Sequence, residues 1–144
     1  MRAIKNFDLF LKQGIVKKQS PDRSRAEFLR EESQKSYLFL EKKVEVFGIN
    51  DETANDIVKS CYDILMGLIR ARMLLKGYNA LGQGAHEAEV SYLRILEFKE
   101  RDVQFLDQIR YFRNGMLYYG SSLDEEYASK AFEFTQTILT KLKY

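Results

Sequence analysis

The sequence has few of the residues that interrupt helices or cross-link a chain. Its 144 residues include one proline and eight glycines, whereas an all-β domain of this length uses more of both in its many turns. A single cysteine, Cys61, excludes an internal disulfide and is typical of a reducing compartment. Because Cys61 stands among apolar residues, we expect a small buried side chain rather than a reactive thiol.

Long apolar runs and an excess of one charge are also missing. No uninterrupted apolar run approaches the roughly 20 residues that span a bilayer, and the N-terminus lacks the features of a signal peptide. We therefore expect a cytoplasmic protein without membrane contact. The 23 Lys and Arg residues nearly balance 21 Asp and Glu, so any contact with nucleic acid must be local rather than driven by net charge.

What the sequence does contain is enough apolar surface for one core. Hydrophobic residues make up 45% of the chain, which predicts a single domain over residues 1–144. The scarcity of turn residues favours an all-α fold, an up-and-down helical bundle of about five or six helices with short connections. Helical periodicity places these helices at about 1–13, 21–47, 51–77, 85–98, 103–120 and 124–144.

Several signals set the helix boundaries. Ser20 reads as an N-cap before Pro21, Asn50 or Asp51 caps the third helix, and Asp124 begins the last one. Residues 77–84 hold three glycines and little periodicity, so we expect a loop and no strand. Residues 99–102 form either a turn or a polar continuation. The second helix has the expected buried stripe Ala26, Leu29, Ser33, Ser36, Leu40, Val44 and Phe47, in which the serines permit close helix contact.

The segment 103–120 places two arginines beside an apolar line. Its purest apolar line is Phe105, Ile109, Phe112, Met116 and Tyr119, and the adjacent line is Leu106, Arg110, Arg113 and Leu117. Two guanidiniums one turn apart repel each other unless an anion lies between them. One possibility is an ordinary salt bridge, with Asp107 or a Glu of another helix as the anion. The other is a phosphate or a group of a partner chain.

Asn114 adds a further polar group on the same segment. Asn114 and Gly115 are poor helix formers in mid-segment, and Asn114 shares a face with Tyr118. Such a conflict between helix propensity and fold indicates either a functional position or a hydrogen bond to a neighbouring loop with close helix packing.

Two strings resemble a known family. Arg110-x-x-Arg113-Asn114, followed by Tyr118-Tyr119-Gly120 at a helix end, looks like the final motif of HEPN domains. The segment 77–87 is similar to the glycine-rich loop before the fourth helix of prokaryotic, especially archaeal, members, and the order and lengths of the helices also agree. In ribonuclease members, an Arg and a His from two protomers meet across a dimer interface and cleave RNA without a metal.

The resemblance assigns roles to individual residues. It gives the arginine role to Arg113 and the following polar role to Asn114, but Tyr118 stands where the histidine usually does. A Tyr, with a reference pKa of about 10, is a poorer general base at neutral pH than a His at about 6.5. Either Tyr118 has a different task or catalysis has been lost.

His86, the only histidine, offers an alternative to the missing one. It stands at the start of the fourth helix, where a histidine also serves as a local hydrogen-bonding group. With one His and one Cys, the sequence shows no metal site and no cofactor motif. Tyr111, Tyr118 and Tyr119 lie near the arginines in sequence and either stack on bases or pack in the bundle.

Three hypotheses follow for the function. The first is a HEPN-like homodimer that binds RNA or a nucleotide through Arg110, Arg113, Asn114, Tyr118, Tyr119 and His86. The resemblance adds a toxin-like role paired with a small nucleotidyltransferase. The second is a metal-independent endoribonuclease in which Tyr118 or His86 replaces the usual histidine. The third is a dimeric scaffold with a degenerate site.

Overall fold

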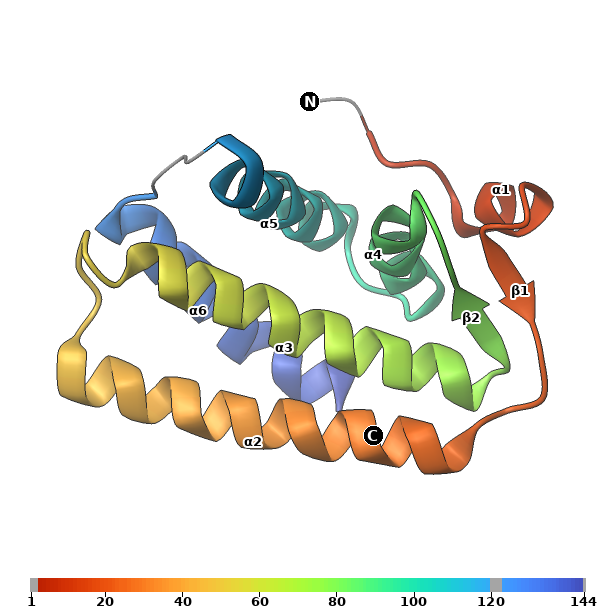
Figure 1. Cartoon of the computed structure of the whole chain (residues 1–144), viewed down its shortest axis with the longest axis horizontal. Coiled ribbons are helices and arrows are strands. Elements are labelled where there is room, and N and C mark those ends of the chain that lie inside the picture. Colours follow the sequence, from red (N-terminus) through yellow and green to blue (C-terminus); the bar gives the residue numbers. More distant parts are fainter. Residues whose placement is uncertain (1–2, 120–122, 144) are drawn as a thin grey trace.

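The chain is described by a computed structural model over residues 3–119 and 123–143, with side chains for all of these except 116–119. The mostly helical architecture expected from composition is confirmed. The described part of the chain forms six helices and two short strands, and their arrangement is drawn in Figure 1. They are α1 (Phe7–Lys12), β1 (Val16–Lys18), α2 (Arg23–Phe47), α3 (Ala54–Leu75), β2 (Tyr78–Ala80), α4 (Ala85–Ile95), α5 (Glu100–Tyr119) and α6 (Glu125–Leu142).

Helix α3 forms the centre of the core. It packs against α2, α4, α5 and α6, and Figure 1 shows it between α2 on one side and α4 with α5 on the other. A helix covered on several faces is apolar nearly all round, which explains why α3 buries far more residues than one stripe holds. Cys61 is fully buried there, and burial raises the pKa of its thiol to about 11. Its predicted role as a small core residue is confirmed.

The close contact between α2 and α3 depends on small residues. Ser33 is buried, and a Cβ added at Gly67 would overlap its Oγ. The close helix contact predicted at Ser33 is therefore confirmed. The predictions for Ser36 and Phe47 are wrong, because both side chains are exposed. The stripe that faces α3 passes through Tyr37 instead, and Phe47 lies at the end of α2, before the turn that leads into α3.

The two strands contradict the prediction that residues 77–84 form a loop without a strand. β1 and β2 pair antiparallel, with Val16 opposite Ala80 and Lys18 opposite Tyr78. Three-residue strands are too short to show an alternating pattern, and each finds its partner far away in the sequence. Beyond the paired residues, Gln19 N donates a 2.7 Å hydrogen bond to Gly77 O. This small sheet ties the segment before α2 to the segment before α4.

Capping side chains mark the start of α2 and of α6. The prediction that Asp124 begins the last helix is confirmed, since its carboxylate accepts a 2.9 Å hydrogen bond from Tyr127 N. The Ser20 prediction is wrong by two residues, because Asp22 caps α2 by accepting from Arg25 N. Asn50 Oδ1 accepts from Thr53 N in the turn before α3, and Thr53 is the N-cap.

Other boundaries differ modestly from expectation. The first helix begins at Phe7, and α4 ends at Ile95. Residues 96–99 form the connection to α5, which begins at Glu100. No helix in the described residues has the length and apolarity needed to cross a membrane.

Candidate functional site

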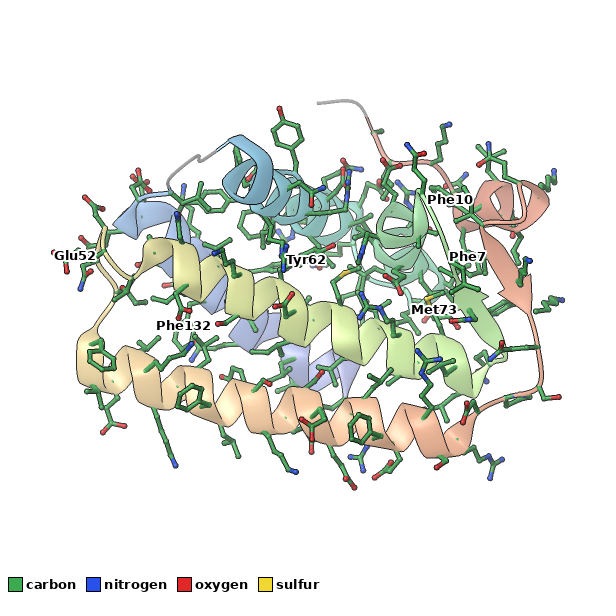
Figure 2. The ribbon with its side chains drawn as sticks, viewed as in Figure 1. Phe7, Phe10, Glu52, Tyr62, Met73 and Phe132 are labelled. Carbon is green, nitrogen blue, oxygen red and sulfur yellow. The ribbon has the colours of Figure 1, made fainter. Side chains whose placement is uncertain are left out.

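A cavity of about 220 Å³ lies where α3, α4 and α5 meet. Figure 2 labels Tyr62 on the part of α3 that faces α5. The cavity brings together the predicted residues His86, Arg113 and Asn114. Among the described side chains, its lining is Tyr62, Asp63, Met66 and Arg70 of α3, His86 of α4, and Arg113 and Asn114 of α5.

Arg113 is held in this cavity by contacts with two side chains of α3. Its guanidinium carbon lies 5.9 Å from the centre of the Tyr62 ring, a cation–π distance, and its Nη2 lies 3.7 Å from Asp63 Oδ1. The Asp63 carboxylate is 63% exposed, so the pair is loose and well solvated. The Nε atom of Arg113 is buried and has no hydrogen-bond partner among the described residues. An unsatisfied buried donor is costly and marks Arg113 as a position that needs an acceptor.

A buried carboxylate lies beside the cavity. Glu89 is almost fully buried and accepts a 2.6 Å charge-assisted hydrogen bond from Arg70 Nε. Burial raises the pKa of Glu89, and the hydrogen bond from Arg70 opposes that rise. The pair holds Arg70 at the cavity wall with its charge largely balanced.

His86 stands at the rim beside the same pair. Its Nδ1 lies 3.5 Å from Glu89 Oε1, an oxygen with no hydrogen-bond partner in the described part of the chain, and its side chain is 60% exposed. The ring is 6.3 Å from that of Tyr62, centre to centre. His86 therefore adds a solvent-accessible hydrogen-bonding group to the rim of the cavity.

Arg110 does not line this cavity. Its Nε donates a 2.7 Å hydrogen bond to Asp107, which is nearly buried, and its Nη2 lies 3.5 Å from Glu87 of α4. The salt bridge considered from the sequence, with Asp107 or a Glu of another helix, is therefore what the structure contains. Arg110 joins α4 to α5 and so fixes the cavity walls.

The predicted apolar line of the fifth helix needs a correction. Ile109 is fully buried, but Phe105 and Phe112 are only half-buried. Leu106, assigned to the neighbouring line, is fully buried as well. The buried face of α5 therefore lies closer to the line that includes Arg110 than the sequence predicts. Helices α3 and α4 both pack on that side of α5.

Three of the predicted tyrosines are not placed in the cavity. The side chains of Tyr118 and Tyr119 fall outside the described residues, so their assigned roles stay predictions. Tyr111 is exposed and packs edge-on against Phe112, 5.7 Å away between ring centres. It does not line the cavity.

Sequence reasoning missed the α3 side of the site. Tyr62, Met66 and Arg70 follow one another at intervals of four, so they share one helix face. The signal available was Arg70 itself, a charged residue within the most apolar helix of the chain. A buried or half-buried charge needs a partner, and Glu89 is that partner.

Within the residues described, no group of three or more His, Cys, Asp and Glu side chains has the arrangement to hold a metal ion. Comparisons with protein-family models, with curated proteins and with solved structures found no match to this chain.

Proposed function

We propose that this chain is a HEPN-like protein that binds a phosphate group of RNA or of a nucleotide in the cavity between α3, α4 and α5. The proposal rests above all on the buried Nε of Arg113, a charged donor without a partner among the described residues. A phosphate oxygen is the acceptor that a guanidinium fits best, since the planar group donates in a fork. Asn114 and His86 supply further hydrogen-bonding groups in the same cavity.

The charges in the cavity favour Arg113 as the main ligand. Arg70 is already paired with the buried Glu89, whereas the acidic group beside Arg113 among the described residues is the exposed Asp63, at 3.7 Å. Asp63 is free to turn toward water when an anion enters, because its carboxylate is mostly exposed. Binding therefore replaces a weak, solvated ion pair with a charge-assisted hydrogen bond.

The size of the cavity limits what it encloses. At about 220 Å³ it is smaller than the roughly 300–1,000 Å³ of pockets that bury a drug-sized ligand. It suits a phosphate with part of a ribose, and the base then lies outside the cavity. Tyr118 and Tyr119 of the resemblance remain our candidates for base stacking there.

The test is a binding titration with metal-free protein, a labelled mixed RNA pool and single nucleotides. We expect Arg113→Ala to weaken binding about 10- to 100-fold, since hydrogen bonds to charged groups contribute roughly 1.5–3 kcal/mol. Arg101→Ala is the matched control, because Arg101 is an exposed arginine near the start of the same helix. Equal affinity for the wild type and Arg113→Ala, or equal losses in both variants, would refute the site.

A metal-independent endoribonuclease is the second candidate, favoured by the presence of His86 in the cavity of Arg113. In this reaction His86 takes the proton of a ribose 2′-OH, and the 2′ oxygen attacks phosphorus. The bond to the 5′ oxygen breaks, and that oxygen takes up a proton, which leaves a 2′,3′-cyclic phosphate. Arg113 stabilises the charge that develops on the phosphoryl oxygens.

Cleavage of the same RNA pool separates the two candidates. If the enzyme hypothesis holds, His86→Gln loses cleavage and keeps binding, and Tyr118→Phe reports whether the tyrosine takes part. Binding without cleavage in the wild-type protein supports the binding function alone. Cleavage that survives both substitutions would exclude both residues as the acid or base.

Two expectations from the resemblance remain proposals. A dimeric scaffold with a degenerate site predicts that Arg113→Ala weakens dimerisation and changes no ligand affinity, which sedimentation and titration distinguish. The pairing with a small nucleotidyltransferase, as toxin and antitoxin, predicts that expression of this chain slows growth and that the partner restores it.

A further inference from the structure

Helix α2 has an exposed face that no other described element covers. Figure 1 shows α2 along one edge of the molecule, and Figure 2 shows side chains projecting from its outer side. Its inner face packs on α3 through Ala26, Ser33 and Leu40, all buried. Beyond that inner row, α2 has large apolar side chains that are 59–72% exposed, namely Phe28, Leu38, Phe39, Val46 and Phe47. Of these, Phe28, Phe39 and Val46 lie opposite the inner row.

The outer residues repeat at alternating intervals of four and three. We call the exposed row Phe28, Glu32, Lys35, Phe39, Lys42 and Val46 the outer seam, and all six residues are exposed. Spacing of this kind is the heptad pattern by which one helix packs lengthwise against another. In an α-helix these positions lie on one face, roughly opposite the row that contacts α3.

We propose that the outer seam binds a second copy of this chain, in an antiparallel α2–α2 pair related by a two-fold axis that crosses the seam at the level of Tyr37 along the helix. This geometry places opposite each other the residues that lie at equal distances from Tyr37 along the helix. Phe28 of one copy then faces Val46 of the other, Glu32 faces Lys42, and Lys35 faces Phe39. Each contact occurs twice.

The chemistry of the three contacts is complementary. Phe28 with Val46 is apolar, and Glu32 with Lys42 joins opposite charges. Lys35 with Phe39 is a cation–π contact, and the Phe39 ring already has Lys43 Nζ of its own chain 5.1 Å from its centre. A parallel pair would instead place each of Glu32, Lys35 and Lys42 against its own copy. Charge therefore selects the antiparallel arrangement.

The rim of the pair contains one unfavourable contact. The antiparallel arrangement brings Glu31 of one copy near Glu45 of the other, and both are exposed. Residues 28–46 span about 27 Å of helix, so this interface belongs near the lower end of specific interfaces, at roughly 1,200 Å². We expect a reversible dimer whose population depends on protein concentration.

Sedimentation equilibrium of the full chain over a range of concentrations tests the seam. We expect a mass that rises from one to two copies, and at least a tenfold weaker association for Glu32→Lys and for Lys42→Glu, which each put like charges in two contacts. The double variant exchanges the two charges and should regain the wild-type association. Glu45→Lys should strengthen it, because it replaces the Glu31–Glu45 repulsion with an attraction.

A second kind of variant guards against indirect effects of charge. Phe39→Ser removes an exposed ring at the middle of the seam and should also weaken association, with unchanged thermal unfolding at low protein concentration. A wild-type protein that stays monomeric at all concentrations overturns the proposal. The proposal is also overturned if single charge reversals leave the dimer affinity unchanged, or if the double variant does not regain the wild-type affinity.

The outer seam and the cavity lie on opposite sides of α3. The seam variants should therefore keep the RNA and nucleotide affinity of the wild type, and Arg113→Ala should keep the dimer. The seam does not depend on the proposed function, so the failure of either proposal leaves the other standing. It is also separate from the dimer that the HEPN resemblance implies, in which the two arginine motifs meet.

Discussion

The contact between Gly67 and Ser33 predicts a substitution whose effect on stability changes sign with its background. In the wild-type chain, a methyl group at Gly67 would overlap Ser33 Oγ, and overpacking of this kind costs about 1–3 kcal/mol. Alanine gains about 1 kcal/mol over glycine in a helix interior. We therefore expect Gly67→Ala to lower the free energy of unfolding by about 1 kcal/mol, a loss of roughly 3–4 °C in Tm.

In a Ser33→Ala background the overlap is absent, and the higher helix propensity of alanine over glycine remains. The new methyl group would then have Ser33 Cβ as its neighbour at 3.6 Å, an ordinary contact. There we expect Gly67→Ala to stabilise the protein by about 1 kcal/mol. Urea unfolding of the wild type, both single variants and the double variant measures the coupling, for which we expect about 1–3 kcal/mol. Equal effects of Gly67→Ala in the two backgrounds would show that the close contact is wrongly assigned.

The remaining predictions concern a buried pair, a buried thiol and a helix cap. Arg70→Met leaves the Glu89 carboxyl buried without its cation, so the pKa of Glu89 in the folded protein rises further above the unfolded value near 4.5. The free energy of unfolding of this variant should therefore fall as pH increases from about 4.5 toward 7, which urea titrations at several pH values measure. Cys61 is buried, and the pKa of its thiol is raised. The native protein should therefore react with a thiol reagent at pH 8 only as fast as it unfolds, and rapid labelling would contradict this. Asp124→Ala removes the cap of α6 and should cost about 1 kcal/mol by thermal unfolding, whereas Asp124→Asn should cost little.

The helices were predictable because their signals are local. Few prolines and glycines, apolar residues at helical spacing and a capping aspartate at Asp124 each act within a few residues. In α6 the residues at helical spacing, Ala128, Ala131, Thr135, Ile138 and Leu142, are buried in the structure. The strands were not predictable, since a three-residue strand has no pattern of its own and is formed by its pairing partner.

The candidate site was only half visible in the sequence. The motif residues Arg113 and Asn114 stood out by their types and spacing, and His86 by being the only histidine. Apart from the HEPN resemblance, which gives the arginine role to Arg113, nothing in the spacing distinguished Arg113 from Arg110, which is three residues away on the same helix. The structure separates them, because Asp107 and Glu87 reach Arg110, whereas the ion pair described for Arg113 is the loose one with the exposed Asp63.

By itself, the sequence determined the helical class, the position of most helices and which residue types are available for anion binding. These follow from backbone propensity and side-chain periodicity, which act over a few residues. The tertiary structure alone decided that α3 contributes Tyr62 and Arg70 to the cavity, that Glu89 is buried beside them, and that the outer face of α2 is left uncovered. Those features depend on which helices pack against each other, and this packing is determined by contacts between residues far apart in the sequence.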